Sequence, residues 1–450
     1  MPRARALLCG ALLLAGCGPS GEGAIVLEGA TLLDGSGGRP IQDAVIVVRD
    51  GRIEAVARVG EVRVPKGARV ERLVGKTIMP GLIDAHAHVE RWALPLYLAW
   101  GVTTVRDMGS AGDSAYALQR DLRLGAVTGP RMFTSGPMID GAPATYRTAT
   151  EVTTADEAGR AVGQRAIAGA HYLKLYTKIT PALQRALMEE ASVLHLPLAA
   201  HLGRTDALTA ARLGVASIEH LSGIVQAASP NGAAVVRAHD LFLAGWTAEQ
   251  QGWATLDSGA IARTARSLAQ AGVAVVPTLV LYEMLARLDD RTLLARPEMA
   301  DLPAAGAGVR GVAGLVRRAG WRPVDFATFR SARRQQDLFV REFKRANGLV
   351  AAGSDAANQL LVPGAALHHE LALLVDAGLS RLEAITAATR HAARLLGADS
   401  LGLVAVGKVA DLVILNANPA DDIAATRDIA AVMIRGRLLA VDSIRATWRR

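Results

Sequence analysis

Hydrophobic and polar residues alternate in short stretches at both ends of the chain. These stretches are residues 24–33, 43–48, 52–56, 410–415, 431–434 and 437–441. Such alternation is typical of strands with one buried face, and Arg435 with Gly436 reads as a hairpin turn. We therefore predict that residues 24–77 and 401–450 together form one small β-sandwich.

Between these ends, residues 78–400 show another pattern, in which short apolar stretches alternate with amphipathic ones such as 180–194 and 205–213. The apolar stretches are residues 77–86, 103–108, 131–135, 172–176, 197–201, 217–220, 273–281 and 349–355. Strands separated by helices indicate βαβ units and a parallel sheet. Eight of them predict an α/β fold with a closed (β/α)8 TIM-type barrel.

The first residues have the pattern of an export signal. A basic start is followed by an apolar run at 6–15 that is too short for a permanent membrane span. The sequence Leu14-Ala15-Gly16-Cys17 resembles a bacterial lipoprotein signal, which predicts a signal peptide at 1–17, a lipid anchor at Cys17 and a tether at 18–23. An ordinary cleaved signal peptide is the alternative. The lipoprotein interpretation places the protein in the bacterial cell envelope, on the periplasmic side or at the outer membrane.

Composition narrows the function classes. The chain has 450 residues, is 51% hydrophobic and carries a formal net charge of +8, so it can bury a large core. Arginine supplies most of the positive charge, and only six of the 50 basic residues are lysines. Because this charge is scattered along the chain, we do not expect nucleic-acid binding. The two cysteines, Cys9 and Cys17, both lie near the N-terminus, so the body of the chain has no disulfide framework and no thiolate metal site.

Metal-binding side chains stand at the ends of several predicted strands. His86 and His88 end the first strand, and residues two apart on a strand share a face. Four further side chains end the fourth, fifth, sixth and eighth strands: Lys174, His201, His220 and Asp355. In a barrel all these strand ends open into one cavity, where active sites lie. The sequence therefore predicts a metal site there.

Seven motifs carry a resemblance to a known family. In chain order they read TIMPGLIDAHAHV, GVTTVRDMG, YLKLY, AAHLGR, SIEHL, AAGSDA and GKVADLVIL. This ordered set resembles the amidohydrolase superfamily, specifically its imidazolonepropionase-like and prolidase-like group, and spans about residues 24–442. The resemblance implies a binuclear metal centre with two divalent ions. It assigns His86, His88 and Asp355 to one ion and His201 and His220 to the other.

The resemblance also implies that Lys174 bridges both ions after carboxylation. An ammonium group has no lone pair to offer a cation, whereas a lysine carbamate is an anionic ligand with two oxygens. Lys178 is the competing lysine, but it lies beyond the predicted strand. Zinc is the default metal for such a set of nitrogen and oxygen donors, with manganese, cobalt and iron as alternatives.

This centre predicts hydrolysis of a C–N bond in an amide, cyclic amide or dipeptide by a metal-activated water. Asp355 would take the proton of the water and deliver it to the leaving nitrogen. A lactonase or phosphoester hydrolase could use the same water, and a catalytically silent, lipid-anchored binding protein is a further alternative. The sequence contains no phosphate-binding or dinucleotide-binding glycine motif.

The substrate is expected to be a small molecule bound by loops after the strands. In the loop at 136–150, Tyr146 and Arg147 could bind a carboxylate, as could Arg204 after the fifth strand. Prolidase-like relatives commonly have a histidine in the corresponding loop, and its absence here weakens the prediction of a peptidase. Relatives form dimers or larger rings, so a homo-oligomer is also left open.

Overall fold

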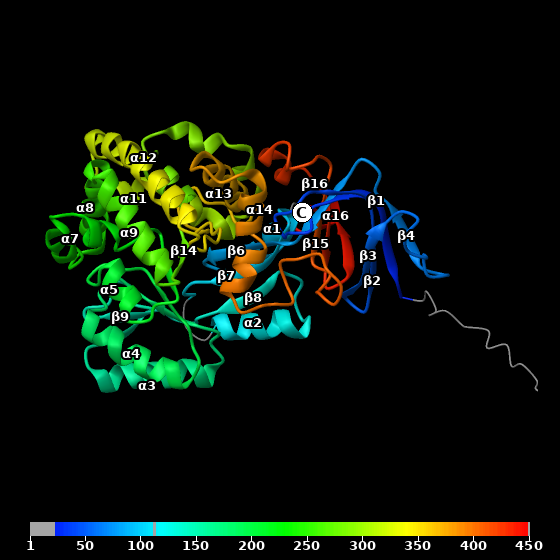
Figure 1. Ribbon diagram of the computed structural model, residues 1–450. Helices are drawn as coiled ribbons and strands as arrows, with labels where there is room; N and C mark the ends of the chain where they lie inside the picture. The colour runs from blue at the N-terminus through cyan, green and yellow to red at the C-terminus, as the bar shows by residue number, and fades with distance from the viewer. Residues whose placement is uncertain (1–22, 111–113, 449–450) are drawn as a thin grey trace, which may run out of the picture.

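The computed structural model describes residues 23–110 and 114–448, so the predicted lipid anchor at Cys17 lies outside the described residues. Both ends of this part contribute to one eight-stranded sheet in the order β17-β16-β15-β5-β1-β2-β3, with β4 paired to β1 (Figure 1). The strands are β1 (Ile25–Leu32), β2 (Ile41–Arg49), β3 (Arg52–Arg58), β4 (Arg69–Arg72), β5 (Thr77–Pro80), β15 (Leu412–Leu415), β16 (Ile429–Ile434) and β17 (Arg437–Ala440). β5 lies between β1 and β15 and so joins the two ends of the chain.

The remaining strands are parallel and belong to two sheets. One contains β6 (Leu82–Ala87), β7 (Val102–Asp107) and β8 (Arg131–Thr134). The other has the order β10-β9-β11-β12-β13-β14. Its strands are β9 (Ile139–Gly141), β10 (Thr150–Val152), β11 (Leu173–Leu175), β12 (Leu198–Ala200), β13 (Ser217–Glu219) and β14 (Ala274–Val276). This is the α/β arrangement that the sequence predicts.

The eighth expected strand, residues 349–355, does not form a regular ladder, and the barrel is not closed. The segment makes isolated bridges instead, Val275 with Val350 and Ala87 with Ala356. Its backbone departs from a strand because Asp355 has φ +56°. A Cβ on Gly353 would lie 2.7 Å from Cβ of His86, so glycine permits a close approach to β6. The irregular segment therefore still lies beside the first strand.

One predicted strand, 77–86, is divided at Gly81. Its first half is β5 of the terminal sheet, and its second half is β6 beside β7. A Cβ on Gly81 would lie 2.1 Å from Oγ1 of Thr103. Glycine therefore lets the chain pass from one sheet to the other within a single residue.

Helices surround the parallel strands, except for α16, which packs on β16 and β17 of the terminal sheet. Those before β14 are α1 (Leu94–Ala99), α2 (Ser114–Leu124), α3 (Ala155–Ala168), α4 (Pro181–Val193), α5 (Ala207–Arg212), α6 (Ile224–Ala228), α7 (Gly232–Ala238), α8 (Phe242–Thr255) and α9 (Ser258–Gln270). Those after β14 are α10 (Leu279–Leu285), α11 (Val312–Ala319), α12 (Pro323–Arg345), α13 (Ala365–Asp376), α14 (Arg381–Ala387), α15 (Arg390–Leu395) and α16 (Val441–Arg445). Short 3-10 helices cover Arg91–Ala93, Arg291–Ala295, Pro297–Asp301, Ala304–Arg310 and Ile423–Arg427. Among the described residues, no helix combines the length and apolar character needed to cross a membrane.

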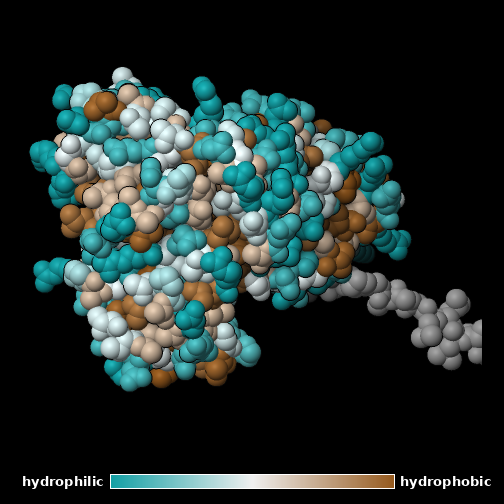
Figure 2. All heavy atoms as spheres, turned by 60° about the vertical axis from the view of Figure 1, so that its left-hand side comes forward, coloured by the Kyte–Doolittle hydropathy of each residue, from teal (hydrophilic) through white to brown (hydrophobic). Residues whose placement is uncertain are grey.

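Two insertions lie at the carboxyl ends of the strands. One consists of α6, α7 and α8 after β13, and the other runs from α10 to α12 after β14. They contact each other, because α12 packs on α8 and α9. α12 buries Phe326, Phe329, Phe339 and Phe343 and turns its arginine-rich face outward, as expected of an amphipathic surface helix. Figure 2 shows that hydrophilic residues with smaller hydrophobic patches cover this side of the molecule.

Candidate metal centre

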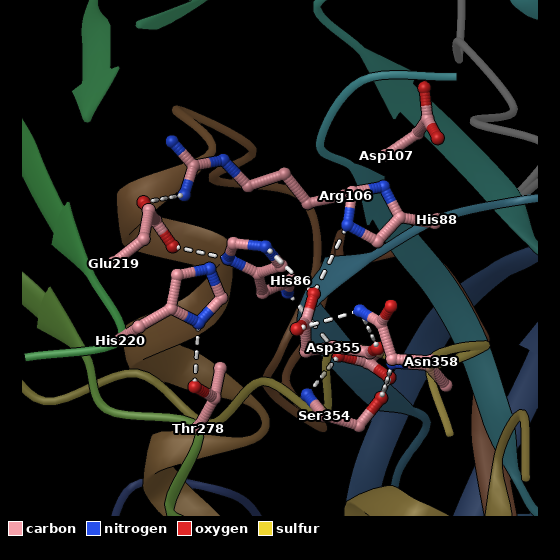
Figure 3. Close-up of polar contacts among 12 residues, drawn as sticks. His86, His88, Arg106, Asp107, Glu219, His220, Thr278, Ser354, Asp355 and Asn358 are labelled. Carbon is pink, nitrogen blue, oxygen red and sulfur yellow. Dashed lines mark hydrogen bonds and ion pairs between the residues drawn. The ribbon is translucent and has the colours of Figure 1, made fainter. Parts of the chain in front are cut away.

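Three of the predicted ligands form a compact group. The Nε2 atoms of His86 and His88 lie 3.3 and 3.1 Å from Oδ1 of Asp355, as Figure 3 shows from one side. One donor atom from each residue lies within 4.8 Å of the other two, a spacing that can hold a metal ion. His86 is on β6, His88 follows it, and Asp355 belongs to the irregular eighth segment. These three side chains therefore form a candidate metal site.

Asp84 fixes the eighth segment against β6. Its Oδ1 accepts hydrogen bonds from the backbone nitrogens of His86 (3.2 Å) and Ser354 (2.9 Å). Its Oδ2 accepts a third from the Ser354 hydroxyl at 2.5 Å. Burial raises the pKa of Asp84 to about 6, although these hydrogen bonds act in the opposite direction. This clamp sets the position of Asp355, the next residue along the chain.

Glu219 orients His86. Its Oε2 lies 2.7 Å from Nδ1 of His86, and its Oε1 accepts a hydrogen bond from Arg106 at 3.0 Å. Burial alone would raise the pKa of Glu219, but the Arg106 charge and the His86 contact lower it to about 2. Because an ionised carboxylate can only accept, Nδ1 of His86 carries the proton. Nε2 of His86 is left with its lone pair, as a metal ligand requires.

The other three predicted ligands line the same cavity as this group. They are Lys174 on β11, His201 after β12 and His220 after β13. The His220 ring centroid lies 4.2 Å from that of His86 and 4.7 Å from that of His201. Thr278 Oγ1 lies 2.8 Å from Nδ1 of His220, which leaves Nε2 of that ring for a ligand. The fold thus brings all six residues to one cavity.

The electrostatics of these side chains follow from their burial. Burial lowers the pKa of Lys174 to about 8, and it lowers the pKa values of His201 and His220 well below the ordinary value. The pKa of Asp355 lies well below its usual range, because the neighbouring imidazoles outweigh the effect of burial. Burial therefore favours the neutral imidazoles of His201 and His220, beside an ionised Asp355.

The cavity has a volume of about 400 Å³, and about half of the residues that line it are aromatic or aliphatic. Among the predicted substrate residues, Tyr146 lines it. Arg147 is exposed and is not part of the lining, and Arg204 forms an ion pair with Asp240 at 2.6 Å beside another cavity. The arginine that lines the cavity is Arg318 of α11. The sequence pattern did not indicate Arg318, because α11 lies far along the chain from the loop at 136–150.

Several residues of the site carry no assignment from the sequence. Besides Glu219, these are Thr278, which contacts His220, and Asn358, which donates a hydrogen bond to Oδ2 of Asp355 at 2.8 Å. Glu219 could have been recognised from the sequence. It lies in an apolar strand directly before the predicted ligand His220, and a buried acidic residue needs a partner. Thr278 and Asn358 lie in turns, and the sequence pattern does not show where those turns place their side chains.

Comparisons with known proteins identify the family of this chain. The model of the amidohydrolase family matches residues 77–439. No curated protein sequence matches the chain. Among solved structures, a candidate prolidase from Bifidobacterium longum is 26% identical, with a TM-score of 0.70 over 95% of this chain and 99% of that one.

Two further structures share the fold at lower identity. A Xaa-Pro dipeptidase with bound methionine in its active site is 21% identical, with a TM-score of 0.68 over 93% of this chain and 100% of that chain. A bottromycin amidohydrolase is 24% identical, with a TM-score of 0.73 over 94% of this chain and 88% of that one. Because the family model covers most of the sequence, this chain belongs to the amidohydrolase family.

Proposed function

We propose that the protein is a metal-dependent hydrolase of a carbon–nitrogen bond in an amide, cyclic amide or dipeptide. The observation that carries the proposal is the convergence of six potential metal ligands from five separate segments of the chain in one cavity. Three of them, His86, His88 and Asp355, are close enough to share one ion. A cavity of this volume accommodates a small-molecule substrate.

Buried polar atoms without hydrogen bonds support the binding of metal. His86 Nε2, Lys174 Nζ and Asp355 Oδ1 are buried and make no hydrogen bond among the described residues, although His86 Nε2 lies 3.3 Å from Asp355 Oδ1. A buried polar atom without a partner is costly, so these three atoms favour a ligand that they would share. We assign His86, His88 and Asp355 to one divalent ion and His201 and His220 to a second, with zinc as the expected metal.

Lys174 would join the two ions as a carbamate. Its side chain is 1% exposed, and its lowered pKa increases the fraction of neutral amine, which is the form that attacks carbon dioxide. Carboxylation turns a buried cation into an anionic ligand and removes the cost of an isolated buried charge. Lys178 is placed differently, because its Nζ donates to the carbonyl of Pro143 at 2.6 Å.

The residues of the chain then have separate tasks. Bound divalent ions would polarise the scissile carbonyl and make water a better nucleophile. Asp355 would accept the proton of the attacking water and transfer it to the leaving nitrogen. Asn358 holds Oδ2 of Asp355, so Oδ1 faces the histidines. The solved relatives named as prolidase, dipeptidase and amidohydrolase make a dipeptide-type amide the first substrate class to test.

The test measures metal content and turnover together. Protein expressed with zinc should contain close to two ions per chain and hydrolyse at least some members of a panel of N-acyl amino acids, Xaa-Pro and Xaa-Arg dipeptides and cyclic amides. Asp355→Asn should abolish turnover without unfolding the protein, whereas Asp290→Asn, at the surface, should not change it. Faster hydrolysis of lactones or phosphotriesters than of any amide would contradict the proposal. Metal binding without any turnover would favour a silent binding protein.

We also propose that Cys17 is lipidated and anchors the enzyme in the bacterial cell envelope. The support is the signal pattern at 1–17, and a lipid anchor needs no membrane-spanning helix. Mass spectrometry of the N-terminal peptide should show acyl chains on Cys17. Cys17→Ser should release the protein into the soluble periplasmic fraction.

A further inference from the structure

One end of the cavity has no role in the proposed hydrolysis. It is formed by α11 and by Trp321, which lies just beyond the end of α11, in the insertion after β14. Leu315 and Arg318 of α11 both line the cavity, and residues three apart lie on the same helix face. The metal-binding side chains are mostly buried, whereas Arg318 is exposed, so the cavity runs from the metal centre toward Arg318 at its mouth.

Arg318 has no acidic partner in the part of the chain that the structure describes. No ion pair involves it, although the arginines on α12 form several. One of its terminal nitrogens lies 3.3 Å from the position that a Cβ on Gly314 would occupy, so the side chain folds back along its own helix. Asp355 is the one acidic side chain among the residues that line the cavity. The guanidinium donors are therefore free for a ligand.

Tyr146 lines the same cavity as this arginine. It reaches the cavity from the loop between β9 and β10. A phenol and a guanidinium at one mouth offer neutral and charged donors to the same anion. The mouth is thus suited to an oxyanion.

Aromatic side chains line the cavity between the mouth and the metal centre. Trp246 of α8 packs against Trp321, with ring centroids 5.2 Å apart. The ring centroids of Tyr176 and Phe242 are 5.8 Å apart. Tyr176 also contacts His201, at 4.9 Å between ring centroids. These rings line the same cavity as the predicted metal ligands and favour a bulky apolar group.

We propose that Arg318, assisted by Tyr146, binds a carboxylate of the substrate, so that the enzyme selects acidic amides with a bulky apolar or aromatic group. The inference rests on the proposed function for the position of the scissile bond at the metal centre. A guanidinium forms paired hydrogen bonds with a carboxylate, which supplies both charge and direction. Arg318 therefore takes the place that the sequence suggested for Arg147.

The experiment compares two ligands that differ by one carboxylate, N-acetyl-L-phenylalanine and N-acetyl-2-phenylethylamine. Binding is measured by calorimetry in the zinc-loaded Asp355→Asn protein, where turnover does not interfere. The acid should bind at least tenfold more tightly than the neutral compound. Arg318→Ala should weaken binding of the acid about fivefold to tenfold and leave the neutral compound within twofold.

Controls separate this effect from a general loss of structure. Arg317→Ala removes an exposed neighbour on the same helix that does not line the cavity, and it should change neither affinity. Arg318→Lys should restore part of the affinity for the acid. Equal binding of the two ligands by the unsubstituted site, no binding of either, or an equal effect of Arg318→Ala on both would overturn the inference.

The outcomes also distinguish this inference from the proposed function. Selective binding of the acid that depends on Arg318, in an enzyme that hydrolyses no amide, would refute the hydrolase and keep the carboxylate site. Amide hydrolysis that is indifferent to the carboxylate and to Arg318 would keep the hydrolase and refute the carboxylate site.

Discussion

Glu219 and His86 form a fully buried pair, with Oε2 of the carboxylate 2.7 Å from Nδ1 of the imidazole. Arg106 holds the second carboxylate oxygen. The pair fixes both the orientation and the tautomer of a predicted metal ligand, so its effect should appear in metal affinity before it appears in the fold.

Glu219→Gln should weaken metal binding about 10-fold to 100-fold, because loss of such a supporting carboxylate lowers the basicity of the ligand and loosens the ring. Competition with a chromophoric chelator measures this affinity. A matched control is Glu249→Gln, which alters a buried glutamate paired with His239 at 3.0 Å outside the metal centre. Glu249→Gln should lower stability and leave metal affinity unchanged. Equal losses of affinity in the two variants would contradict the assigned role of Glu219.

Lys174 and Lys178 can be distinguished by their chemistry toward carbon dioxide. After equilibration with ¹³C-bicarbonate and zinc, the protein should show one protein-bound carbamate signal by ¹³C NMR. Lys174→Gln should lose the signal together with most of the bound metal. Lys178→Gln should retain the carbamate signal and the metal, because the Lys178 amine donates a hydrogen bond to the carbonyl of Pro143. A signal that survives in Lys174→Gln would exclude Lys174 as the bridging ligand.

Gly81 should be essential for the junction between the two sheets. Gly81→Ala places a methyl group 2.1 Å from Thr103 Oγ1 and should destabilise the protein by about 1–3 kcal/mol, the usual cost of overpacking. Gly163→Ala on α3 is the control, because a Cβ there meets nothing within 4 Å. That change should raise stability by about 0.5–1 kcal/mol through helix propensity. Urea unfolding of both variants gives the free energies, and a neutral effect of Gly81→Ala would refute the close approach.

Glu370 should make stability fall as the pH rises. Burial raises its pKa from 4.5 to about 8, so the folded protein retains a proton that the unfolded chain releases above pH 4.5. Its contribution to stability is therefore complete below about pH 4.5 and declines between pH 4.5 and 8. Its Oε2 accepts a hydrogen bond from the nitrogen of Val280 at 2.8 Å, which glutamine can also satisfy. Glu370→Gln should flatten this part of a plot of unfolding free energy against pH, and an unchanged slope would contradict the assignment.

The convergence of the candidate ligands in one cavity could be predicted from the sequence alone. A histidine pair at the end of an apolar stretch, and further donors at the ends of other stretches, require only that parallel strands end at one edge of a barrel. The sequence did not show that the eighth predicted strand would be irregular. Residues 349–355 have the composition of a strand, but the Asp84 clamp and the left-handed backbone of Asp355 determine their course.

The supporting and substrate residues depended on tertiary structure. Glu219 is recognisable only when Arg106 and His86, from two other strands, are seen on its two oxygens. Arg318 is one arginine in a chain rich in arginine, and nothing in the residues around it points to a cavity. By itself the sequence determined the fold class, the family resemblance and the candidate ligands, because these follow from local periodicity and short motifs. Tertiary structure alone decided which charges face one another across the cavity, because those contacts join segments more than a hundred residues apart.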